Sequence, residues 1–221
     1  MILFLLTAMP LFFAFTVLLP WDGQKTPRRL FIVFQFLRGV VLFFPAWLIL
    51  LVLRRIAGFA YSGFPLFLSL LARDHLPPIL LAVGGFLLVM RAVQYPSSDE
   101  GVFLATVSFL SGFFAMMSVA DFIAGYGRWD AHALFLLPLS RVAGVLFLSA
   151  IARRYERWEG RAGLAYFGVA AGVSVLACSA SFLLVVNRGL FAFVMVAIFL
   201  AASVLFAAAM HPRVVLGRSA P

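Results

Sequence analysis

The chain has 221 residues, of which 65% are hydrophobic and 11% charged, and its formal net charge is +9. A soluble domain carries about a quarter of its residues as charged side chains, so this composition excludes a water-soluble surface and requires contact with lipid. The basic residues stand mostly at the ends of apolar stretches, without a nucleic-acid-binding motif, which excludes nucleic acid as a partner and indicates anionic lipids at the cytoplasmic face.

These properties predict an all-α fold, a polytopic transmembrane helical bundle. No polar stretch is long enough for a separate soluble domain, so residues 1–221 are expected to form a single integral membrane domain. Apolar stretches long enough to cross a bilayer predict about seven spanning helices. Their approximate positions are 1–20, 30–53, 78–95, 101–125, 131–153, 162–186 and 190–210.

The segment 56–76 is harder to assign. Its apolar part is close to the lower length limit for spanning, and Gly58, Gly63 and Pro65 interrupt it. We expect an interfacial or re-entrant helix here, with a full span as the alternative. The paired prolines Pro77 and Pro78 are then expected to begin the next helix.

The distribution of basic residues predicts the orientation. The Arg-rich loop at 153–161 and the C-terminus are cytoplasmic with seven spans and the N-terminus outside, and equally with eight spans and the N-terminus inside. The location of the N-terminus therefore stays open. The expected compartment is the bacterial cytoplasmic (inner) membrane.

Two opposite charges fall inside neighbouring predicted spans. Asp121 lies roughly 6 Å from the end of its helix and Arg141 roughly 15 Å into the next one. The short connection makes these helices antiparallel neighbours, so the two side chains are expected to meet, with Ser118 and Gly144 leaving room. The pair is either a structural salt bridge or a gate or ion-coupling site, since unpaired charges inside a membrane are costly.

Arg38 is a second intramembrane cation, with Gln35 one turn before it. It is expected to reach lipid phosphate at the inner surface, and the alternatives are a lipid or anionic ligand site, a contact with another protein, or pairing with Asp121. We take Asp121, Arg141, Arg38 and Ser118 as the candidates for a substrate or ion-coupling site.

Gly168 and Gly172 form a small-xxx-small pattern and are predicted to serve helix packing. Close approach within the chain is the expectation, and packing between chains is the alternative.

The sequence offers no motif for catalysis, metal binding or a cofactor. His75, His132 and His211 stand at or beyond the ends of the predicted spans, and the only lysine, Lys25, is in a loop, which excludes an intramembrane Schiff base. We therefore predict no catalytic residues, no metal site and no cofactor.

Three classes of function remain. The first is a non-catalytic subunit or scaffold of a membrane assembly, with other proteins as partners. The alternative is a small transporter or permease component with its polar site at Asp121 and Arg141. The third is an intramembrane lipid-modifying enzyme, for which the sequence supplies no convergent polar cluster.

Overall fold

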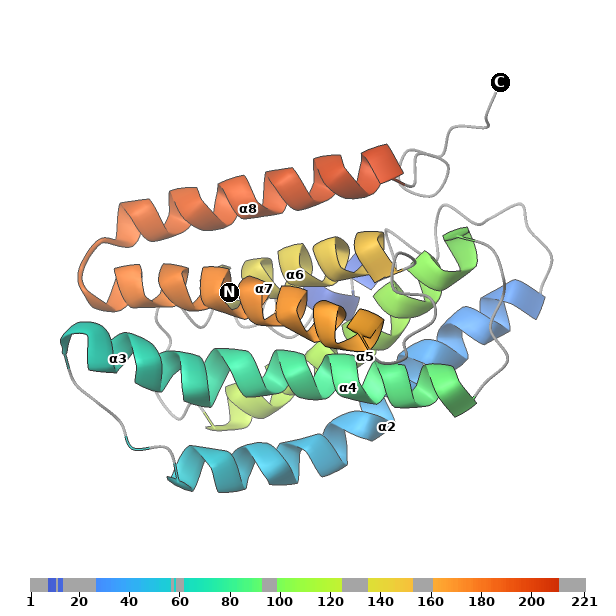
Figure 1. Cartoon of the computed structure of the whole chain (residues 1–221), viewed down its shortest axis with the longest axis horizontal. Helices are drawn as coiled ribbons and strands as arrows, with labels where there is room; N and C mark the ends of the chain where they lie inside the picture. The colour runs from blue at the N-terminus through green and yellow to red at the C-terminus, as the bar shows by residue number, and fades with distance from the viewer. Residues whose placement is uncertain are drawn as a thin grey trace.

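The fold is taken from a computed structural model, which describes residues 8–10, 12–13, 27–56, 58, 62–92, 99–124, 135–152 and 161–210. The predicted all-α fold is confirmed, because the regular elements in these ranges are helical. They are α2 (Pro27–Ile56), α3 (Gly63–Leu70), the π-helical turn η3 (Leu71–His75), α4 (Leu76–Ala92), α5 (Asp99–Ala124), α6 (Leu137–Ile151), α7 (Arg161–Val185) and α8 (Gly189–Met210). Figure 1 shows them as a bundle of elongated helices.

Five helices in the described part of the chain are long and apolar enough to cross a membrane, which indicates an integral membrane protein. They are Leu30–Ile56, Gly63–Arg91, Gly101–Ile123, Arg161–Val185 and Gly189–Met210, and α6 is a shorter apolar helix. The predicted first span at 1–20 lies mostly outside the described residues. The predicted number of about seven spans is therefore not tested and stays a prediction.

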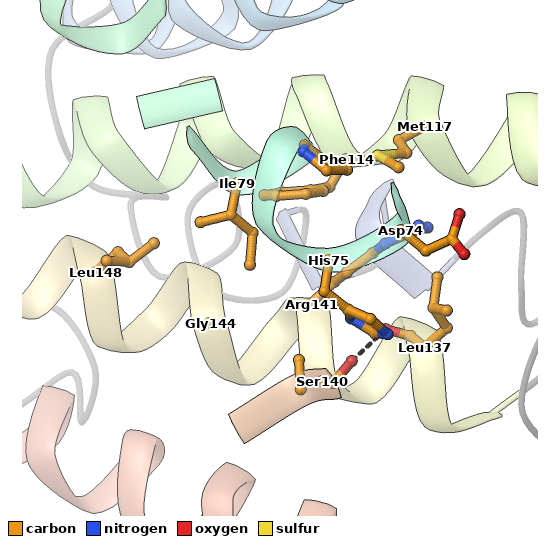
Figure 2. Close-up of a pocket in the computed structure, with 12 residues that line it drawn as sticks. Asp74, His75, Ile79, Phe114, Met117, Leu137, Ser140, Arg141, Gly144 and Leu148 are labelled. Atoms are coloured by element: carbon orange, nitrogen blue, oxygen red, sulfur yellow. Dashed lines mark hydrogen bonds between the residues drawn. The ribbon is translucent and has the colours of Figure 1, made fainter. Parts of the chain in front are cut away.

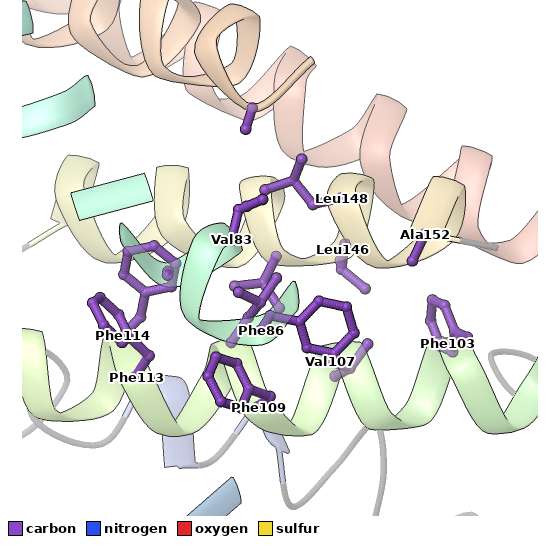
Figure 3. Close-up of a cluster of buried hydrophobic side chains, with 14 of the residues drawn as sticks. Val83, Phe86, Phe103, Val107, Phe109, Phe113, Phe114, Leu146, Leu148 and Ala152 are labelled. Atoms are coloured by element: carbon purple, nitrogen blue, oxygen red, sulfur yellow. The ribbon is translucent and has the colours of Figure 1, made fainter. Parts of the chain in front are cut away.

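Helix α5 occupies the centre of the bundle. Its apolar window is 89% buried, against 22% for α2 and for α8, so α5 is surrounded by protein while α2 and α8 present most of their surface outward. Aromatic side chains of α5 fill the interior: Phe109 packs on Phe86 of α4, and Phe113 packs on Phe43 of α2, each with ring centroids 5.6 Å apart. Figure 3 shows this cluster between α4, α5 and α6.

Helices α2 and α5 approach each other closely, and this approach depends on two glycines. A Cβ atom added to Gly39 would clash with the carbonyl oxygen of Phe109, and one added to Gly112 would clash with the carbonyl oxygen of Phe36. Each glycine thus faces the backbone of the other helix. Small residues allow membrane helices to pack this closely, where dispersion and Cα–H···O contacts replace the missing hydrophobic drive.

The glycines chosen from the sequence do not play this role. A Cβ atom at Gly168 or Gly172 would meet nothing within 4 Å, and both residues lie on the exposed side of α7. The expectation that they bring helices together within the chain is therefore wrong. Packing of these two glycines between chains stays a prediction.

The boundary expected at Pro77 and Pro78 is also absent. One helix runs from Gly63 to Arg91 and contains both prolines. A proline inside an α-helix removes a donor and collides with the carbonyl four residues earlier. The π-helical turn at Leu71–His75 widens the helix just before the prolines, and the N–H of Leu76 donates to the carbonyl of Leu71 across this turn. The structure thus joins the segment 56–76 to the next predicted span from Gly63 onward, while its depth in a membrane stays a prediction.

Candidate functional site

Four charged side chains from four different elements form a continuous ionic chain, which we call the charge network. Arg54 lies in the last turn of α2, Asp74 in η3, Asp121 near the end of α5 and Arg141 in α6. Nε of Arg54 lies 3.2 Å from Oδ1 of Asp74, and Nη2 of Arg54 lies 3.5 Å from Oδ1 of Asp121. Nη2 of Arg141 contacts Oδ2 of Asp121. The network therefore ties α2, η3, α5 and α6 together.

Asp121 and Arg141 meet as the short connection between their helices predicts. The Arg141 side chain is only 8% exposed, whereas that of Asp121 is 23% exposed. Nη1 of Arg141 donates a hydrogen bond to Oγ of Ser118 at 3.1 Å, and Ser118 in turn donates to the carbonyl of Phe114 at 2.9 Å. The Phe114 ring lies 5.9 Å from the guanidinium carbon, within the range of a cation–π contact.

A small cavity with a partly polar wall adjoins the network and is bordered by η3, α4, α5, α6 and α7. Asp74, His75, Ser140 and Arg141 contribute its polar wall, as Figure 2 shows. The hydroxyl of Ser140 donates to the carbonyl of Leu137 at 2.9 Å. The free space is about 20 Å³, which suits a single water molecule. The cavity is too small for an organic solute in this conformation.

The position of His75 corrects the sequence analysis. The sequence places it at the end of a span, but the side chain is only 5% exposed and lies inside the bundle. The reason is the continuous helix through Pro77 and Pro78, which carries the residues before the prolines into the interior. A π-helical turn changes the directions of the side chains around it, and such turns are frequent at functional sites.

Arg38 is not part of the charge network. Arg38 precedes Arg54 on α2 by about 24 Å along the helix. The alternative that Arg38 pairs with Asp121 is therefore wrong, because Arg54 is the arginine of α2 that contacts Asp121. Gln35 is fully buried next to it on the same helix. Among the described residues, neither amide atom of Gln35 nor Nη1 of Arg38 has a hydrogen-bond partner.

The sequence analysis missed two members of the network, Arg54 and Asp74. Arg54 is followed directly by Arg55, and a pair of arginines at the end of an apolar stretch is typical of a helix end at the membrane surface. The sequence pattern therefore gave no indication that Arg54 pairs with an acid. Asp74 carries a usable signal: it is an acidic residue about 11 residues into the Gly63–Arg91 helix. Treating the segment as a full span would have made Asp74 an intramembrane acid in need of a partner.

Three buried serines, Ser108, Ser111 and Ser118, form a polar stripe along α5, and local bonds occupy most of their hydroxyls. Ser108 donates to the carbonyl of Leu104 at 2.6 Å, as Ser118 does to that of Phe114. Ser111 has no hydrogen-bond partner for its hydroxyl within the described ranges. Only Ser118 connects the stripe to the charge network.

Both carboxylates of the network contact guanidinium groups, which is unlike the arrangement of a metal site. No group of three or more His, Cys, Asp or Glu side chains comes together in the part of the chain that the structure describes. What the arrangement provides is a set of charge-assisted bonds between helices, with two acids balanced by two arginines.

No protein-family model, curated protein or solved structure matches this chain.

Proposed function

We propose that the protein is a non-catalytic, multi-pass subunit or scaffold of a membrane assembly, in which the charge network acts as an ionic clasp. The observation that carries the proposal is the balance of the network: Arg54, Asp74, Asp121 and Arg141 come from separate elements and each contacts an opposite charge. A binding site for a charged substrate needs an uncompensated charge, and this network holds none among its four members.

The small size of the cavity beside the network supports the same proposal. Space for about one water molecule beside Arg141 does not accommodate a transported solute. The outer helices offer large apolar surfaces instead, with Phe34, Val41 and Leu48 of α2 and Leu190 and Leu205 of α8 among the exposed side chains. Such surfaces suit lipid or the apolar helices of partner proteins. We propose a bacterial inner membrane as the compartment and a cytoplasmic C-terminus, an assignment that the distribution of basic residues supports.

Purification in mild detergent from the native host, followed by mass spectrometry, tests the proposal. We expect a reproducible, stoichiometric set of partner proteins. We also expect the double variant Asp121→Asn/Arg141→Gln to keep these partners when it folds, because the clasp is structural. A protein that purifies alone, or partners that depend on the charges in a folded variant, contradicts the proposal.

A small transporter or permease component is the second candidate. The observation that favours it is the partial exposure of the two acids: the side chain of Asp74 is 32% exposed and that of Asp121 is 23% exposed, so the network is reachable from one side. In that case the clasp is a gate, and opening it connects the buried Arg141 and Ser118 to water.

Cysteine labelling separates the two candidates. Cys178 is the only cysteine, so Cys178→Ala provides a cysteine-free background. Ser118→Cys reports on the network, and Ser108→Cys is the matched control, because both serines are fully buried on α5. For a structural clasp we expect neither position to react with a membrane-impermeant thiol reagent. Labelling at 118 but not at 108 indicates an opening gate and transport.

A further inference from the structure

A groove lies between α2, α4 and α7 and is separate from the charge network. Its volume is about 560 Å³, within the range of small-molecule sites, and nearly all its lining is apolar. Leu42, Pro45, Ala46 and Ile49 line it from α2, in the spacing of a single helix face. Pro45 lies inside α2, which is visibly bent in Figure 1.

Among the described residues that line the groove, one is charged, and it lies at one end. Arg91 lies in the last turn of α4, and its exposed side chain borders the groove. Gly163 and Leu164, in the first turn of α7, border the same end, and Arg161 begins that helix. The charge network lies toward the opposite end, where α2 and α5 finish. The described part of the groove is therefore apolar along its length and has an arginine at one end.

The length of the groove matches one leaflet of a bilayer. From Leu80 to Arg91 it follows α4 for about 16 Å. Half of a typical hydrocarbon core is about 15 Å. Its sides open onto outward-facing apolar residues, with Leu88 at 65% exposure and Leu164 at 72%. An acyl chain lying in the groove thus brings its headgroup to the level of Arg91.

We propose that this groove is a binding site for one anionic phospholipid, with an acyl chain between α2, α4 and α7 and the phosphate at Arg91. The apolar wall supplies dispersion contacts along the chain. The guanidinium supplies a charge-assisted, bidentate contact for phosphate, a geometry for which arginine is well suited. The N-terminal N–H groups of α7 add positive potential at the same end.

Two variants test the two halves of the site. Arg91→Gln removes the cation, and Arg188→Gln is its matched control, because Arg188 is an exposed arginine in the link between α7 and α8, at the other end of the bundle. Gly84→Leu fills the groove: a Cβ atom at Gly84 makes only ordinary contact, 3.5 Å from the Phe167 ring, and the rest of the leucine side chain then occupies the space of the lipid.

The measurement is native mass spectrometry of the full chain in detergent, titrated with phosphatidylglycerol or with phosphatidylcholine of the same acyl chains. We expect phosphatidylglycerol to be retained more strongly, and Arg91→Gln to weaken its retention about fivefold, as one cation near a membrane surface contributes. Arg188→Gln is expected to have no comparable effect. Gly84→Leu is expected to weaken retention of both lipids. A photoreactive phosphatidylglycerol is expected to label peptides from α2 and α4.

Three results overturn the proposal. The first is equal retention of the two lipids, and the second is an equal loss for Arg91→Gln and Arg188→Gln. The third is displacement of the lipid by inorganic phosphate at millimolar concentration, which identifies a site for the free ion. If Gly84→Leu does not fold, Arg91→Gln and the labelled peptides decide alone.

Discussion

Asp121→Asn is expected to destabilise the bundle by about 3 kcal/mol, the lower end of the range for a broken buried ion pair, because Asp121 is partly exposed. The variant leaves the guanidinium of Arg141 buried without its carboxylate. Arg141→Gln is expected to cost less, since Asp121 keeps its contact with Arg54. The network thus predicts an asymmetry between two substitutions that an isolated pair would not show.

Thermal unfolding in mild detergent, read by circular dichroism, measures these differences. The double variant Asp121→Asn/Arg141→Gln is expected to be more stable than the sum of the single losses predicts, with a coupling free energy of about 1–3 kcal/mol. Arg55→Gln is the matched control, because Arg55 is an exposed neighbour of Arg54 and its loss is expected to change stability by less than about 0.5 kcal/mol. Additive losses would show that the contact does not stabilise the fold.

Gly112→Ala is expected to have an effect of similar size for a different reason. The added methyl group collides with the carbonyl oxygen of Phe36, and backbone cannot move aside as a flexible side chain does. The helices α2 and α5 must separate, and overpacking of this kind costs about 1–3 kcal/mol or more. Gly39→Ala, facing the carbonyl of Phe109, is expected to act in the same way.

Gly168→Ala is the matched control for the glycine substitutions. The chemical change is identical and the residue also lies within a helix long and apolar enough to cross a membrane, but the methyl group meets nothing within 4 Å. We expect its unfolding temperature in detergent to equal or slightly exceed that of the wild type, whereas that of Gly112→Ala falls clearly. Equal behaviour of the two variants would contradict the close approach of α2 and α5.

The class of the protein and one of its key contacts are predictable from the sequence. The all-α membrane fold follows from composition and from the lengths of apolar stretches, both of which are local properties. The contact between Asp121 and Arg141 follows from two charges in consecutive helices joined by a short connection, because such helices are antiparallel neighbours. The predicted roles of Asp121, Arg141, Arg38 and Ser118 in coupling remain to be tested.

The remaining features depended on long-range packing. Arg54 and Asp74 join the network from elements far from Asp121 and Arg141 in the sequence. His75 is buried in a π-helical turn, in a helix that continues through two prolines. The sequence pattern favours Gly168, yet Gly112 makes the close helix contact. In a soluble protein, polar residues mark the outer face of a helix. In this protein the lipid and the protein interior are equally apolar, so the sequence does not mark which helix faces meet. The sequence alone determines which segments enter the membrane, and the tertiary structure decides which of their faces are in contact.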